Sequence, residues 1–163
     1  MKKIRIFALV LALVMCFGLL AGCGGKDDAA DDKITIAFIG NTTGDYAQYG
    51  IPVRNGVKLY IDQLNAKGGI NGKQVELLEY DDKGDGVEAV NAFNLAMDKG
   101  ITAVIGSVLT GASISLADAT YEVNMPQISA SATAAGLTVM EDGSVRTNVA
   151  FAVRTFLREN GCR

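Results

Sequence analysis

Short apolar segments alternate with segments of helical periodicity along most of this chain. The apolar segments are residues 34–40, 75–82, 102–107 and a weaker fourth at 126–132. Runs of this kind are typical of strands that are buried on both faces of a sheet. This alternation constrains the fold most, because strands that alternate with helices require right-handed crossovers between parallel neighbours.

Between the predicted strands, apolar residues recur at three- and four-residue steps, which places them on one face of a helix. In the three predicted helices these residues are Val53, Val57, Tyr60, Ile61 and Leu64; then Val90, Phe93 and Met97; then Ile114, Ala117 and Tyr121. We interpret each face as a core-packing surface. The order β-α-β-α-β-α-β predicts an α/β fold, a doubly wound parallel sheet covered by helices on both sides.

The amino terminus has the pattern of a lipoprotein signal peptide. Three basic residues precede an uncharged apolar run at residues 7–20, which is shorter than the roughly 20 residues that a transmembrane helix needs. Small residues then lead to Cys23, and Leu-Ala-Gly-Cys resembles the bacterial lipobox. We therefore expect residues 1–22 to be a cleaved signal peptide and Cys23 to carry the lipid. An anchoring helix with an incidental cysteine is the alternative.

The expected domain organisation follows from that cleavage. Residues 23–33 are polar and acidic, which is typical of a flexible linker. Residues 34–163 then form one domain, of ordinary domain size. A metal-binding role for the acidic linker is the less favoured interpretation.

The composition excludes several classes of function. The formal net charge is −3, and loss of the basic leader would make it more negative, which disfavours a nucleic-acid partner. The chain has no histidine, so the commonest metal ligand and general base is missing. Of three cysteines, Cys16 lies in the leader, Cys23 is the lipid site and Cys162 is alone. We expect no metal, no cofactor and no internal disulfide.

Ligands of doubly wound sheets bind beyond the carboxyl ends of the strands. The segments there are residues 41–50, the loop from Lys83, residues 107–113 and residues 131–138, and three of them are rich in hydroxyls and small residues. Such loops are poor equipment for catalysis but suit a small polar molecule.

The candidate site residues are Tyr49, Thr110, Gly111, Ser131 and Thr133. Free amides at a helix start near Thr110, with a hydroxyl beside them, are suited to a carboxylate. Gly111 allows close approach to the backbone, and Tyr49 offers an apolar wall with a polar tip. The alternative is that each hydroxyl only caps a helix.

Several motifs resemble the solute-binding proteins of ABC importers for branched-chain amino acids. They are "AQYG" at 47–50, "NAKGGINGK" at 65–73 and "EYDD" at 79–82, and "AVIGSVLTGASISLADATYEVNMPQISASATAAGLT" resembles the next part of the family. The resemblance covers about residues 33–138 and implies the first lobe of a type I periplasmic-binding fold. In that family the ligand is held between two lobes.

The resemblance implies roles for the candidate residues. Thr110 matches the hydroxyl residue of the family's "SS" or "TG" motif, Ser131 and Thr133 flank the alanine of its "SAT" motif, and Tyr49 matches the aromatic near the ligand side chain. Some members carry a disulfide where this chain has Gly84 and Leu109.

The resemblance also implies a protein that is a monomer, is lipid-anchored on the extracytoplasmic side, and delivers an amino acid to a membrane permease without acting as an enzyme. Members are about twice this length, so we expect a truncated first lobe with weak binding or none. A non-functional fragment and an enzyme that holds magnesium with Asp81 and Asp82 are alternatives. Amides, urea and aromatic acids also remain open as ligands.

Overall fold

The computed structural model describes residues 33–151 of the 163-residue chain. The predicted signal peptide, Cys23, almost all of the linker and the tail from residue 152 lie outside the described residues. The strands are β1 (Lys33–Gly40), β2 (Gln74–Asp81), β3 (Ala103–Gly106), β4 (Gln127–Ser129) and β5 (Val149–Phe151). The helices are α2 (Ala47–Ala66), α3 (Gly86–Met97), α4 (Thr110–Glu122) and the short 3-10 helix η1 (Ala135–Leu137).

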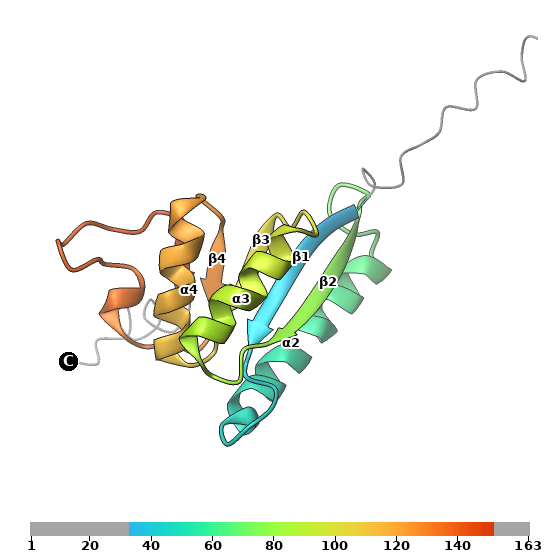
Figure 1. Ribbon diagram of the computed structural model, residues 1–163. Coiled ribbons are helices and arrows are strands. Elements are labelled where there is room, and N and C mark those ends of the chain that lie inside the picture. The colour runs from blue at the N-terminus through green and yellow to red at the C-terminus, as the bar shows by residue number, and fades with distance from the viewer. Residues whose placement is uncertain (1–32, 152–163) are drawn as a thin grey trace, which may run out of the picture. The chain divides into compact units, whose positions relative to one another are not determined.

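The strands form one sheet in the order β2-β1-β3-β4-β5, and all four neighbouring pairs are parallel. The order reverses beside β1, so right-handed crossovers place α2 on one face and α3 and α4 on the other (Figure 1). This arrangement confirms the predicted α/β fold with a parallel sheet.

The sequence pattern missed one strand and overestimated another. The fourth predicted strand, residues 126–132, shortens to β4, because the chain turns toward η1 after Ser129. Strand β5 was not predicted, since three residues are too few to show periodicity. Its amino end is fixed by the chain itself: the amide of Gln127 donates to the carbonyl oxygen of Asn148 at 2.8 Å.

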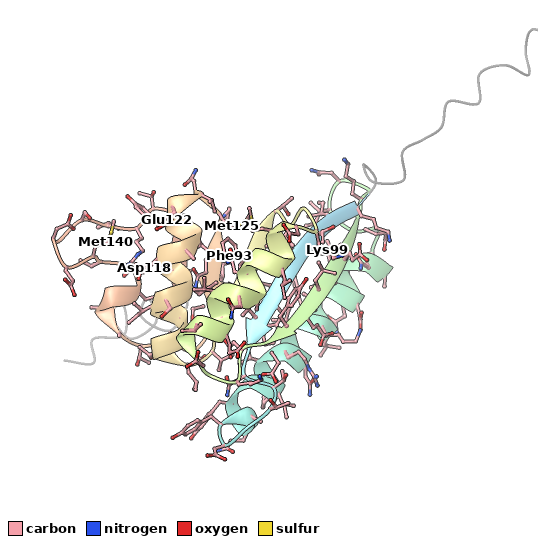
Figure 2. All side chains as sticks on the ribbon, viewed as in Figure 1. Phe93, Lys99, Asp118, Glu122, Met125 and Met140 are labelled. Carbon is pink, nitrogen blue, oxygen red and sulfur yellow. The ribbon has the colours of Figure 1, made fainter. Side chains whose placement is uncertain are left out.

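The main core lies between the sheet and the α3–α4 layer. Ala37, Ile39 and Val104 from the strands are fully buried, and Phe93 and Met125 pack in the same cluster (Figure 2). Helix α3 packs closely because its inner face is mostly alanine, namely Ala89, Ala92 and Ala96. The predicted stripe of Val90, Phe93 and Met97 is therefore half right: Phe93 is buried, while Val90 and Met97 are half-buried.

The opposite face of the sheet is only partly covered within the described residues. Between α2 and the strands runs an apolar groove of about 490 Å³, lined by residues such as Ile36, Val57 and Ile105. Ile128 lies on β4, an internal strand of the sheet, and yet the residue is 49% exposed.

Two predicted core positions are therefore wrong. Tyr60 lines the groove but is 66% exposed, because no second helix covers that face among residues 33–151. Tyr121 is 42% exposed near the end of α4. Their apolar character fits the helical period, but periodicity cannot tell a covered face from an open one.

Within the described range, none of the helices has the combination of length and apolarity that crossing a membrane requires.

Candidate functional site

The carboxyl ends of the strands lead into the loops and helix starts that carry all five candidate residues. The loop after β1 leads into α2, which carries Tyr49, and the loop after β3 leads into α4, which begins at Thr110 (Figure 1). The loop after β4 carries Ser131 and Thr133. Parallel strands end at one edge of a sheet, so the sequence positions of these residues place them all at that edge.

The start of α4 has no side-chain cap. Its N-cap residue is Leu109, whose side chain cannot accept a hydrogen bond, and Thr110 is already the first helical residue. The capping alternative for Thr110 is therefore wrong. The first amides of a helix without a cap are available to an external acceptor, and a carboxylate is favoured there by the helix dipole.

Hydrogen bonds bring the hydroxyl residues of the two loops together. The hydroxyl of Ser131 donates to the carbonyl oxygen of Val108 at 2.8 Å, and the amide of Thr133 donates to Oγ1 of Thr110 at 3.4 Å. Thr133 is exposed and Thr110 and Ser131 are half-buried. Because Oγ1 of Thr110 accepts in this contact, its own proton is left to donate to a ligand.

Gly111 and Tyr49 complete the candidate set in different ways. A Cβ built on Gly111 would meet no heavy atom within 4 Å, so open space lies beside the backbone there. Tyr49 lies in the first turn of α2 and is 56% exposed. No hydrogen bond recorded for the described residues joins Tyr49 to Thr110, Ser131 or Thr133.

Asp81, at the end of β2, fixes the loop after β1. Its carboxylate accepts from the amides of Thr42 at 2.9 Å and Lys83 at 3.0 Å, and from the hydroxyl of Thr43. Burial acts to raise the pKa of Asp81, but these hydrogen bonds outweigh it and hold the pKa below its ordinary value. The carboxylate is therefore committed to protein donors.

Asp82 is fully buried beside it. Its carboxylate accepts from the hydroxyl of Ser107 and from the amide of Gly84, the latter at 2.8 Å. Burial raises the pKa of Asp82, the hydrogen bonds oppose that rise, and the charge of Asp81 adds to it. This geometry opposes a magnesium site built on Asp81 and Asp82, and the described residues contain no cluster of three or more metal-ligating side chains.

Gly84 and Leu109, where the resemblance leads one to look for a disulfide, are neighbours in space. A Cβ built on Gly84 would lie 2.7 Å from Cδ1 of Leu109. Here the leucine side chain fills the gap between the loops after β2 and β3. An apolar contact therefore takes the place that a covalent brace would have.

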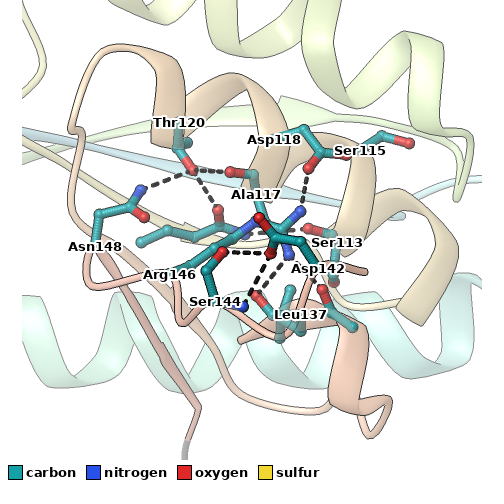
Figure 3. Close-up of polar contacts among 12 residues, drawn as sticks. Ser113, Ser115, Ala117, Asp118, Thr120, Leu137, Asp142, Ser144, Arg146 and Asn148 are labelled. Carbon is teal, nitrogen blue, oxygen red and sulfur yellow. Dashed lines mark hydrogen bonds and ion pairs between the residues drawn. The ribbon is translucent and has the colours of Figure 1, made fainter. Parts of the chain in front are cut away.

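The long connection from β4 to β5 is anchored on α4 by Arg146. This guanidinium is buried and pairs with Asp118, and it also donates to the carbonyl oxygen of Gly136 (Figure 3). Nearby, the side chain of Asn148 donates to the carbonyl oxygen of Met125 at 2.9 Å. Through Arg146, these contacts hold η1, which follows the segment that carries Thr133, against α4.

As a whole, the edge offers hydroxyls, uncapped helix amides and open space, and its two carboxylates at the end of β2, those of Asp81 and Asp82, are engaged by protein donors. That set can hold a small anion or zwitterion, but it contains no nucleophile–base pair. Sequence reasoning missed Asp82, Ser107 and Ser129 as supports of this edge. Their only signal is position, since each lies at or next to the end of a strand.

Comparison with known proteins agrees with this fold. A family model described as "Periplasmic binding protein" matches residues 33–160. The "Leu/Ile/Val-binding protein BraC3" of Rhizobium johnstonii is 39% identical over 109 residues, which is 67% of this chain and 30% of that protein. The leucine-, isoleucine-, valine-, threonine- and alanine-binding protein of Pseudomonas aeruginosa is 38% identical over 119 residues, 73% of this chain and 32% of that protein.

Among solved structures, the branched-chain amino acid transporter substrate-binding protein LivJ of Streptococcus pneumoniae, in complex with isoleucine, matches with a TM-score of 0.66 and 33% identity. The match covers 73% of this chain and 33% of LivJ. This chain thus spans about a third of the length of the relatives it matches. The family is one of solute-binding proteins rather than enzymes. Because its model matches most of the chain, this protein belongs to the periplasmic binding protein family.

Proposed function

We propose that this chain supplies the first lobe of an extracytoplasmic solute-binding protein that delivers a branched-chain or similar amino acid to an ABC permease. The observation that carries the proposal is the uncapped start of α4 beside the Thr110–Thr133 contact. Relatives named for leucine, isoleucine and valine binding support the choice of ligand class.

In the proposed complex, the amides at the start of α4 and the hydroxyl of Thr110 receive the ligand carboxylate. Ser131 and Thr133 offer oxygen acceptors to the ammonium group, because a hydroxyl can accept as well as donate. Gly111 leaves space for close approach, and Tyr49 provides a wall for the apolar side chain. No group in this scheme changes a covalent bond of the ligand.

The proposal includes the attachment of the protein. We propose that residues 1–22 are removed as a signal peptide, that a lipid on Cys23 holds the monomer to the outer face of a membrane, and that residues 23–33 separate the lobe from it. Two or more acyl chains give stable anchoring. The supports are the basic and apolar leader and the lipobox-like sequence before Cys23.

Isothermal titration calorimetry with leucine, isoleucine and valine tests the proposal on the chain as it is. A zwitterion on one open lobe stays half hydrated, so charge-assisted hydrogen bonds to it compete with water. We therefore expect dissociation constants well above the micromolar range, with the three amino acids close together. A sub-micromolar constant for any of the three would contradict the account of a half-hydrated ligand on one lobe.

A further inference from the structure

Three fully buried polar residues connect the loops of the candidate site from below. They are Asp82, Ser107 and Ser129, each with no exposed surface, and each lies at or directly after the carboxyl end of its strand. Buried polar groups are costly unless they are hydrogen-bonded, and each of these has a protein partner.

The first connection crosses a strand. Strand β1 lies between β2 and β3 in the sheet, so Asp82 and Ser107 belong to strands that are not neighbours. The hydroxyl of Ser107 nevertheless donates to the carboxylate of Asp82, beyond the end of β1. The other carboxylate oxygen accepts from the amide of Gly84 at 2.8 Å.

The connection continues to β4 and its loop. The hydroxyl of Ser129 donates to the carbonyl oxygen of Ser107 at 2.9 Å, and its oxygen accepts from the amide of Ala132 at 3.4 Å. Ala132 is buried and lies between Ser131 and Thr133. A continuous series of hydrogen bonds therefore runs from Asp82 to the residue between two proposed ligand contacts.

Asp82 cannot touch a ligand itself, because its side chain has no exposed surface. None of the ion pairs recorded within residues 33–151 includes it. A carboxylate that is buried without a cation is held only by its hydrogen bonds, so its geometry is set by the two loops that it joins.

We propose that Asp82 is a positioning residue, which through Ser107 and Ser129 fixes the loops after β3 and β4 in the arrangement that presents Thr110, Ser131 and Thr133 to the ligand. This role rests on the proposed amino-acid site. It predicts that removing Asp82 loosens the loop after β4, three strands away from β2 in the sheet, while the sheet itself stays intact.

Native-state hydrogen exchange on the ¹⁵N-labelled chain, without ligand, tests the role directly. In Asp82→Ala and in Ser107→Ala, we expect the amides of Ala132 and Thr133 to exchange about tenfold faster or more. The buried hydrogen bonds that hold this loop closed are already lost in these variants, so local opening costs less free energy. The amide of Val104, which donates to the carbonyl oxygen of Pro126 at 2.8 Å within the sheet, should keep its protection. Asp82→Asn, which can still accept from Gly84 and contact Ser107, should restore most of the protection.

The control is Ile101→Val, a core change near the opposite end of β3. It should reduce the protection of the slowest amides throughout the sheet, without singling out Ala132 and Thr133. The role is overturned if Asp82→Ala leaves Ala132 and Thr133 unchanged, or if it lowers their protection only as much as that of Val104. If Asp82→Ala does not fold, the same comparison in Ser107→Ala decides.

A leucine titration of the same samples separates this role from the proposed function. If the unmodified chain shows no leucine-dependent shifts at the site, the function fails even when the exchange pattern holds. If the chain binds leucine and Ser107→Ala binds it equally well, the function stands and the positioning role is overturned.

Discussion

At the scale of single residues, the carboxyl edge combines side chains that are committed to the protein with groups that are left free. Asp81 and Asp82 are both engaged by protein donors, whereas the start of α4 has no side-chain cap. A serine or aspartate at the N-cap readily accepts hydrogen bonds from the first backbone amides of a helix. Asp85 does this for α3 by accepting from the amides of Val87 and Glu88. Helix α2 also lacks a side-chain cap, so the free start of α4 supports a ligand role only together with the neighbouring Thr110–Thr133 contact.

Gly111→Ala should separate stability from binding. The added Cβ meets no heavy atom and alanine favours helix more than glycine does, so we expect the free energy of unfolding to rise by about 0.5 kcal/mol. Binding of leucine should weaken, because the methyl group occupies the space beside the backbone. Urea unfolding and a leucine titration measure the two effects.

The matched control is Gly56→Ala, the same change inside α2, where a Cβ also meets nothing within 4 Å. It should stabilise the protein to a similar extent and leave the leucine titration unaltered. Equal binding by Gly111→Ala and the unmodified chain would show that the ligand does not approach α4 as proposed.

The two neighbouring aspartates should affect stability with opposite pH dependence. The pKa of Asp81 lies below its ordinary value of 3.8, so its carboxylate stabilises the fold above pH 3.8 and this contribution is lost as the pH falls through the folded-state pKa. We expect Asp81→Asn to cost about 1 kcal/mol near neutral pH and progressively less below 3.8. Urea unfolding at several pH values measures this.

Asp82→Asn is the comparison, because burial raises the pKa of Asp82 above 3.8. The unmodified protein should therefore lose stability relative to this variant as the pH rises from 3.8 through the folded-state pKa. Parallel pH profiles for the two variants would contradict the assignment of both carboxylates.

At the scale of secondary-structure elements, the order from β1 to β4 was predictable, because the strands are short apolar runs and the helices have an apolar period, although the run at 126–132 was weak and overestimated β4. Periodicity could not show whether a given face of a helix is covered by other elements or open to solvent. Ile61 and Tyr60 are adjacent on α2 and both fit the predicted stripe, yet Ile61 is 5% exposed and Tyr60 is 66% exposed. The difference depends on which neighbouring elements exist, and that information is not local to the helix.

This difference is measurable as stability. Ile61→Ala removes a buried side chain and should lower the free energy of unfolding by about 2 kcal/mol or more. Tyr60→Ala removes a larger side chain from the rim of the open groove and should cost less than about 1 kcal/mol. If the two variants lose equal stability in urea, the groove is not open in solution.

The site was also predictable only in part. The hydroxyl residues stood out because their loops lack charge, and the structure joins Thr110 with Thr133 and Ser131 with Val108. The buried support from Asp82 to Ser129 was not predictable, because it joins strands that are not neighbours in the sheet. The sequence suggested instead that Asp82 was a candidate metal ligand, and only its burial and hydrogen bonds show otherwise.

At the scale of the whole molecule, the chain belongs to a family of binding proteins but spans about a third of its relatives' length. A ligand bound to this lobe by itself would be exposed to water on one side. Hydration weakens each charge-assisted hydrogen bond, so recognition at this edge should be local and weak.

The most direct test is a ¹H–¹⁵N NMR titration of the chain with leucine. The account predicts fast-exchange shift changes that concentrate on the amides of Thr110, Gly111, Ser131 and Thr133, with smaller changes at Tyr49 and saturation only well above micromolar leucine. Shift changes confined to the opposite edge of the sheet, near Ile70 or Lys99, or no shift changes at all, would contradict it.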